Sequence, residues 1–166
     1  MTFNRATDKP FLRTTGDYLP FTYSKVENVS PTAPSGNRQP YSLASAEVVI
    51  SYNPQIIFID GLGLSTAIQD IKDNIGTLQL IDAISEKQVY KTMVYKSWGT
   101  NWLNQLINVY YVAYVIHGSE LGWTEDDFKQ KANDIIQLFY PGTTVTYSEL
   151  SNAQSGGECR NVSSMI

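Results

Sequence analysis

The pattern that most constrains the fold is the alternation of strand-like and helix-like apolar segments between residues 42 and 142. Residues 55–60, QIIFID, are apolar almost without interruption, as expected for a strand buried on both faces. Residues 87–95, KQVYKTMVY, are rich in Val, Tyr and Thr and are predicted to form the next strand. This alternation predicts an α/β fold, a single three-layer Rossmann-like domain with a mainly parallel sheet flanked by helices.

Four helices are predicted from apolar residues that recur three or four positions apart. Ser42 is the expected N-cap of the first helix, and Thr124 is that of the last. The third helix starts after Thr100 and carries the longest apolar stripe. The four helices are expected to end, in order, at Pro54, Gly76, Gly118 and Pro141-Gly142.

Both ends of the chain are predicted to lie outside the folded part. Residues 1–10 are interpreted as a disordered N-terminal segment and residues 148–166 as a flexible tail, because both offer few large side chains to bury. The folded domain then covers residues 11–147. Within it, residues 30–40, SPTAPSGNRQP, are predicted to form a loop because they are crowded with Pro, Gly, Ser and Asn.

The composition excludes several classes of function. The chain has 166 residues and a formal net charge of −4, with no run of Lys or Arg, which argues against nucleic acid or an anionic membrane as the partner. Cys159 is the only cysteine and His117 the only histidine, so a disulfide framework and a multi-histidine zinc site are excluded. No cofactor, metal or catalytic residue is expected, and the chain is predicted not to be an enzyme.

Two features of the sequence bear on the cellular location: the length of its apolar runs and its first residues. The longest apolar runs are far shorter than the roughly 18 residues that a membrane-spanning helix needs. The first residues, MTFNRATDKPF, lack the apolar core of a secretory signal. A complete chain of this sequence is therefore expected in the cytoplasm, unless the sequence is a mature or truncated form.

A Gly-x-Gly after the first strand supports an alternative function. Gly61 and Gly63 would let the backbone approach a pyrophosphate, and Asp82 lies near the distance, about 20 residues on, at which an acid holds the ribose. However, Thr66 occupies the place of the third glycine of this fingerprint, and Asp60 would put a carboxylate beside the phosphates. The alternatives are a small dinucleotide-binding enzyme domain and a tight strand-to-helix turn.

Aromatic residues gather after the second strand, in VYKSWGTNWL. This segment is expected at the carboxyl edge of the sheet, where ligands of open α/β sheets bind. Trp98 is there either a hydrophobic plug or a platform on which a ligand stacks, and both interpretations stay open. Trp102 is assigned to the core beside the helical stripe, and Asn101 is assigned to the cap or support of the helix start.

The order of these segments resembles a known family. Residues 41–60, YSLASAEVVISYNPQIIFID, precede a helix, then LIDAISEKQVYKTMVYKSWGTNW, a long helix and DDFKQKANDIIQLFYPG. Over about residues 11–142, this order resembles the C-terminal lobe of class III substrate-binding proteins, with TTGDYLPF as an entry segment similar to that of archaeal members. Lys87 occupies the place of the family's glycine before Val-Tyr, so this turn is not expected to adopt a positive φ freely.

The resemblance implies a role in import. These proteins serve ABC importers of iron–siderophore complexes, haem and cobalamin, and they lie outside the cytoplasm, in the periplasm or on the cell surface. They hold the ligand between two lobes and then dock to a permease. This chain would be a single lobe, with the ABC permease, an iron–siderophore or similar chelate, and a separate N-terminal lobe as partners. An orphan lobe that acts only as an interaction module is a further alternative.

The resemblance also implies which residues form the sites. In the family, an acid near the start of the helix before the Asn-Pro strand docks onto arginines of the permease, and Glu47 matches that position. Without the resemblance, Glu47 would be interpreted as balancing the helix dipole. The residues implied to bind the ligand are Thr15, Asp17, Tyr95, Trp98 and Asn101.

Overall fold

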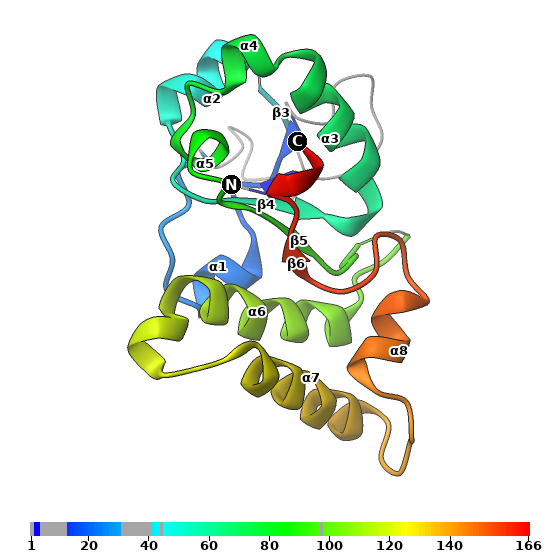
Figure 1. Cartoon of the computed structure of the whole chain (residues 1–166). Helices are drawn as coiled ribbons and strands as arrows, with labels where there is room; N and C mark the ends of the chain where they lie inside the picture. Colours follow the sequence, from blue (N-terminus) through cyan, green and yellow to red (C-terminus); the bar gives the residue numbers. More distant parts are fainter. Residues whose placement is uncertain (1, 4–12, 31–40, 44, 97) are drawn as a thin grey trace. The chain divides into compact units, whose positions relative to one another are not determined.

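A computed structural model describes residues 2–3, 13–30, 41–43, 45–96 and 98–166 of the chain (Figure 1). The chain forms two compact units where the sequence predicts one domain. The sheet unit comprises Met1–Tyr18, Asn28–Thr92 and Arg160–Ile166, and the helical unit comprises Leu19–Glu27 and Met93–Cys159. Periodicity within a segment does not report which segments contact one another, so this division is not visible in the sequence.

The sheet unit is built on a six-stranded sheet, in the part of the chain that the structure describes, with the order β3-β2-β1-β4-β5-β6. Its strands are β1 (Thr2–Phe3), β2 (Arg13–Thr14), β3 (Tyr41–Ser42), β4 (Ile57–Asp60), β5 (Val89–Thr92) and β6 (Arg160–Asn161). β4 is parallel to both of its neighbours, β1 and β5, whereas β2, β3 and β6 pair antiparallel. The sheet is therefore mixed, and the prediction of a mainly parallel sheet is wrong outside its centre.

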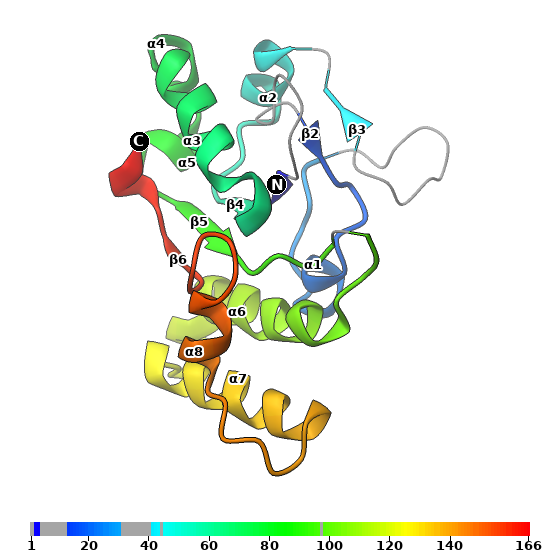
Figure 2. The same cartoon turned by 90° about the vertical axis from the view of Figure 1, so that its right-hand side faces the viewer.

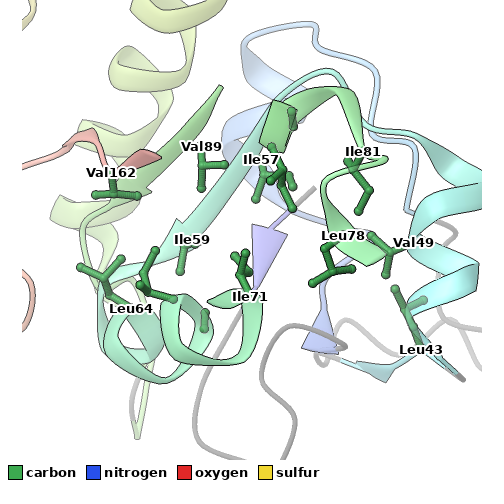
Figure 3. Packing of buried hydrophobic residues seen from close by; sticks show 14 residues of the cluster. Leu43, Val49, Ile57, Ile59, Leu64, Ile71, Leu78, Ile81, Val89 and Val162 are labelled. Atoms are coloured by element: carbon green, nitrogen blue, oxygen red, sulfur yellow. The ribbon is translucent and has the colours of Figure 1, made fainter. Parts of the chain in front are cut away.

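The core of the sheet unit lies on the face of the sheet that carries Ile57, Ile59 and Val89 (Figure 3). All four residues of β4 are buried, as its continuous apolar sequence predicts. Four helices contribute to this cluster: α2 (Ala46–Tyr52), α3 (Leu64–Asp73), α4 (Ile75–Leu78) and α5 (Asp82–Ser85). The sequence predicts Ile68, Ile71 and Ile75 on one helix face. Ile68 and Ile71 of α3 are buried where the helix meets the sheet, whereas Ile75 belongs to α4 and is 39% exposed.

The helix before the first long strand starts later than the sequence predicts. Ser42 belongs to β3, and the N-cap position of α2 is Ser45. The end near Pro54 is confirmed: Asn53 takes the left-handed conformation, with φ 38, and its backbone N–H donates to the carbonyls of Val49 and Ile50. The side chain of Asn53 also accepts a hydrogen bond from the backbone N–H of Asp82, at 2.9 Å. One asparagine therefore both ends α2 and begins α5.

The helical unit contains α1 (Leu19–Tyr23), α6 (Trp102–Leu121), α7 (Glu125–Phe139) and α8 (Tyr147–Asn152). α6 and α7 run side by side, and α8 packs on α7 (Figure 2). Their interface is aromatic, with the Phe128 ring centroid 5.1 Å from that of Tyr111 and 5.3 Å from that of Tyr147. Thr124 forms a capping box with Asp127, as its sequence position predicts. α6 passes the predicted stop at Gly118 and ends at Gly122, whose φ is 65.

The predictions for the two ends of the chain are wrong where the structure describes them. Thr2 and Phe3 form β1 beside β4, while residues 4–10 lie outside the described residues. Residues 148–166 are not a flexible tail, because they include most of α8, the strand β6 and the fully buried Val162. β6 is held by backbone pairing with β5 and by the Asn161 side chain, which donates to the carbonyl of Lys87 at 2.9 Å. Among the described residues, no helix is both long and apolar enough to span a membrane.

Lys87, at the turn into β5, adopts a left-handed conformation with φ 59. The expectation that this turn avoids a positive φ is therefore wrong. Three hydrogen bonds hold the turn. The backbone N–H of Lys87 donates to the carbonyl of Ile84, that of Gln88 donates to the carbonyl of Ala83, and the carbonyl of Lys87 accepts from Nδ2 of Asn161. Surrounding structure thus imposes a conformation that costs an L-residue about 1–2 kcal/mol.

The substitution Lys87→Gly is expected to raise the free energy of unfolding by about 0.5–1 kcal/mol, because glycine takes this φ without strain but loses more chain entropy on folding. Lys72→Gly, in the last turn of α3, is the matched control and is expected to lower it by about 1 kcal/mol. Urea unfolding followed by circular dichroism measures both variants. Equal losses of stability in the two would contradict the prediction.

Candidate functional site

The segment 95–101 forms a closed loop in the helical unit. Lys96 and Thr100 make an isolated antiparallel bridge, and the backbone N–H of Asn101 donates to the carbonyl of Tyr95 at 2.8 Å. Trp98 lies between these closures and is 98% exposed. A side chain this exposed fills no space in the core, so the interpretation of Trp98 as a hydrophobic plug is wrong in this structure. Its indole face is available to a ligand.

The other aromatic residues of this segment are placed differently from the sequence interpretation. Tyr95 is 5% exposed, so its ring contributes to the interior and presents little surface to a ligand. A ligand contact by Tyr95 stays a prediction. Trp102, assigned to the core from the helical stripe, is 61% exposed, and that assignment is wrong. It stands at the first position of α6, where its side chain has no preceding helical turn to lie against.

Asn101 is the N-cap of α6, as its position predicts. Its Oδ1 accepts a hydrogen bond from the backbone N–H of Asn104 at 3.0 Å. This bond satisfies one of the four backbone N–H groups that the start of a helix leaves without an intrahelical partner. A ligand contact by Asn101 stays a prediction, and its side chain has a structural role already.

Sequence reasoning missed the buried amide side chains on α6. Asn104 is 1% exposed and Asn108 is 0% exposed. The side chain of Asn108 exchanges two hydrogen bonds of 3.0 Å with Met93, one with its N–H and one with its carbonyl. Asn104 Nδ2 donates to the carbonyl of Val94 at 2.6 Å and to Oε1 of Gln154 at 2.7 Å. The signal was present, because amides at 101, 104, 105 and 108 share one helix face beside the apolar stripe.

Thr15 and Asp17 belong to the sheet unit, whereas Tyr95, Trp98 and Asn101 belong to the helical unit. Thr14 pairs antiparallel with Phe3, so the chain beyond Thr14 runs toward the amino ends of β1 and β4. Thr15 is 4% exposed, and Asp17 is half-buried. This direction is opposite to the carboxyl edge at which ligands of α/β sheets bind. A ligand contact by Thr15 and Asp17 stays a prediction.

The side chain of Asn28 holds the loop that follows β2 through three hydrogen bonds. Its Nδ2 donates to the carbonyls of Thr15 and Gly16 at 3.1 and 2.9 Å, and its Oδ1 accepts from the N–H of Ser30. The hydroxyl groups of Ser30 and Thr14 are hydrogen-bonded at 2.9 Å in the interior. The conformation of this loop is therefore defined within the sheet unit itself.

Glu47 lies in the first turn of α2 and is exposed. The hydroxyl of Ser45 donates to its carboxylate, and this bond, together with one from its own backbone N–H, lowers the pKa of Glu47. The carboxylate therefore stays charged at neutral pH and lies near the positive end of the helix dipole. These contacts hold the carboxylate at the helix start, and they leave it exposed and accessible to a cationic partner.

The Gly-x-Gly segment does not form an open phosphate cradle. Gly61–Gly63 is a short 3₁₀ helix, and both glycines are buried. Oδ1 of Asp60 accepts the backbone N–H of Leu62 at 2.8 Å, which occupies a donor that a bound phosphate would require. Asp82 starts α5 elsewhere in the sheet unit. This geometry disfavours a dinucleotide site and favours the tight strand-to-helix turn.

The only cysteine and the only histidine have structural contacts in the helical unit. The Cys159 backbone N–H donates to the hydroxyl of Tyr147 at 2.8 Å, and burial raises the pKa of Tyr147. His117 Nε2 lies 3.0 Å from the carbonyl of Ser24. Among the described residues, no group of three or more His, Cys, Asp or Glu side chains is placed to hold a metal ion.

These observations define a mixed α/β fold with an exposed tryptophan on a closed loop and an exposed acid at a helix start. No protein-family model matches the sequence, and no curated protein matches it. A solved structure has a similar fold: an ABC transporter solute binding protein from Sulfurospirillum deleyianum DSM 6946, with a TM-score of 0.64 and 16% sequence identity. The match covers 91% of this chain and 46% of that chain, so this chain spans about half the length of the protein it resembles.

Trp98 and Tyr95 are expected to differ sharply in their contribution to stability. Trp98→Ala should change the free energy of unfolding by less than about 0.5 kcal/mol, because the side chain is exposed. Tyr95→Ala should lower it by about 3–5 kcal/mol, because a buried ring is removed. Urea unfolding of both variants is the measurement, and a loss above about 1 kcal/mol in Trp98→Ala would show that the indole packs against the protein.

Proposed function

We propose that this chain is one lobe of the solute-binding component of an ABC importer, and that its solute is an iron complex or a related metal chelate. The observation that carries the proposal is the similarity of the fold, along 91% of this chain, to an ABC transporter solute binding protein. The chain matches 46% of that longer protein, which is consistent with one lobe of a two-lobed architecture. The order of sequence motifs supports the finer assignment to the class that imports iron–siderophore complexes, haem and cobalamin.

Trp98 is the proposed ligand contact in this lobe. An indole offers a large apolar face, and its exposure in the free protein leaves that face available for burial against the organic part of a chelate. Ligand sites of small molecules bury about 70–90% of the ligand surface. A single lobe supplies only one wall, so weak binding is expected until a second, N-terminal lobe closes over the ligand. Thr15, Asp17, Tyr95 and Asn101 complete the proposed set of ligand residues.

Titration with ferric desferrioxamine, haem and cobalamin, followed by tryptophan fluorescence and by calorimetry, tests the ligand assignment. We expect saturable binding of one chelate, weakened about tenfold or more in Trp98→Ala, because about 1.4 kcal/mol of stacking is lost. Trp123→Phe is the control. Trp123 stacks on Tyr110, and phenylalanine keeps an aromatic ring at that position. Absence of binding by all three chelates, with saturable binding of NADH that is lost in Gly63→Val, would replace the proposal with the dinucleotide alternative.

Glu47 is the proposed docking residue toward the permease. Its carboxylate is charged, exposed and fixed on the first turn of a helix that packs into the core through Val49. A charge at the rim of an interface mainly changes the association rate and its dependence on salt. An acid held in this way suits reversible docking onto arginines of a permease, with the chain outside the cytoplasm, in the periplasm or at the cell surface.

Glu47→Lys is expected to weaken binding to the ABC permease–ATPase complex that the proposed function implies. The affinity at low salt should fall about tenfold or more, and most of the salt dependence should disappear, because attraction is replaced by repulsion. Glu86→Lys, an exposed acid of the same unit, is the matched control and should bind as the wild type does. Binding of labelled chain to the complex in lipid nanodiscs measures this. Equal effects of the two substitutions would remove Glu47 from the docking surface.

A further inference from the structure

The loop that carries Trp98 begins and ends at hydrogen bonds made by one residue, Asn104. At the entry to the loop, Asn104 Nδ2 donates to the carbonyl of Val94 at 2.6 Å. At the exit, its backbone N–H donates to Oδ1 of Asn101 at 3.0 Å. The Asn104 side chain is 1% exposed, and both bonds are partly buried. A buried polar group that loses its partner costs about 1–3 kcal/mol, so the two ends of the loop are strongly constrained.

The orientation of the Asn104 side chain is in turn fixed by Gln154. Oε1 of Gln154 accepts the second Nδ2 hydrogen of Asn104 at 2.7 Å. Gln154 is itself held in a turn after α8, because its N–H donates to the carbonyl of Ser151 and its carbonyl accepts from the N–H of Gly157. A chain of contacts thus connects the segment after α8 with the loop: Gln154, Asn104 and then Val94.

We propose that Asn104 and Gln154 are positioning residues that fix the indole of Trp98 for ligand contact. This inference rests on the proposed function, because it takes Trp98 as the ligand contact. A loop ordered in the free protein loses less conformational entropy when a ligand binds, and its aromatic group is presented in one orientation. Trp98 itself is 98% exposed, so burial of its indole does not order the loop, and the bonds that Asn104 makes at Val94 and Asn101 restrain its two ends.

The neighbouring amide provides a matched comparison. Asn108 lies one helical turn from Asn104 on the same face of α6, and it makes the same kind of contact, to Met93 rather than to Val94. Its hydrogen bonds end before the loop begins. Asn108→Ala therefore removes buried amide hydrogen bonds of similar chemistry without releasing either end of the loop.

The experiment uses the full chain with Trp102→Phe and Trp123→Phe, which leaves Trp98 as the only tryptophan. Asn104→Ala is expected to lower the fluorescence anisotropy of Trp98 and to raise amide hydrogen exchange in residues 95–101 about tenfold, the equivalent of about 1.4 kcal/mol. Asn108→Ala should raise exchange at Met93 and leave the anisotropy of Trp98 unchanged. Affinity for ferric desferrioxamine should fall several-fold in Asn104→Ala and stay constant in Asn108→Ala.

Gln154 supplies a second pair of variants that leaves α6 intact, so the test does not depend on the folding of Asn104→Ala. Gln154→Ala should also lower the anisotropy of Trp98, and Gln154→Glu, which keeps an acceptor oxygen, should restore it. Equal anisotropy in all of these variants would overturn the inference. A loosened loop in the variants, with no chelate bound by the wild-type chain, would overturn the proposed function, while the positioning of Trp98 by Asn104 would stand.

Discussion

The pairing of β4 with β5 is the contact on which the rest of the sheet unit depends. The register places Ile57 opposite Val89 and Ile59 opposite Lys91, and all four of these residues are buried. β1 adds to the other side of β4, and β6 adds to the other side of β5. The helices α2 to α5 then cover the face formed by Ile57, Ile59 and Val89. Parallel strands need a crossover connection, and the segment from α3 to α5 forms the crossover between β4 and β5.

The centre of the sheet could be predicted because its burial and the helix ends beside it are determined by residues that are adjacent in the sequence. A strand buried on both faces must be continuously apolar, and residues 57–60 are fully buried as this rule requires. Capping chemistry is also local, which is why Thr124 and the stop near Pro54 were found. The outer strands could not be predicted, because β1, β2, β3 and β6 are two residues long and show no period.

The tail from residue 148 was misjudged for a related reason. It is ordered by backbone pairing and by the side chains of Asn161 and Ser163, which a measure of apolar content ignores.

The candidate site shows the same division between local and non-local information. Burial alternates beyond β5, where Met93 and Tyr95 are buried and Val94 and Lys96 are half-buried. This alternation continues the strand pattern and could have assigned Tyr95 to the interior from the sequence. The exposure of Trp98 could not be read in this way, because the residue lies inside a loop closed by the bridge between Lys96 and Thr100. The chain direction at Thr15 depended on the antiparallel pairing of β2, which is likewise a non-local fact.

An exposed tryptophan alone is weak evidence for binding, since folded proteins expose single apolar side chains routinely. The buried amides of α6, which bind the chain before the loop, distinguish Trp98 from such side chains. Buried amides destabilise a core unless they are hydrogen-bonded, yet Asn104 and Asn108 of α6 are buried, and each binds the backbone just before the loop. Apolar residues would fill this space at lower risk, so the amides are explained best by a requirement to hold the chain in one place. Trp98 is the largest side chain that this restraint presents to solvent, and Glu47 is presented by a separate unit. Trp98 and Glu47 therefore depend on different cores, and a change that abolishes the contact of one should leave that of the other intact.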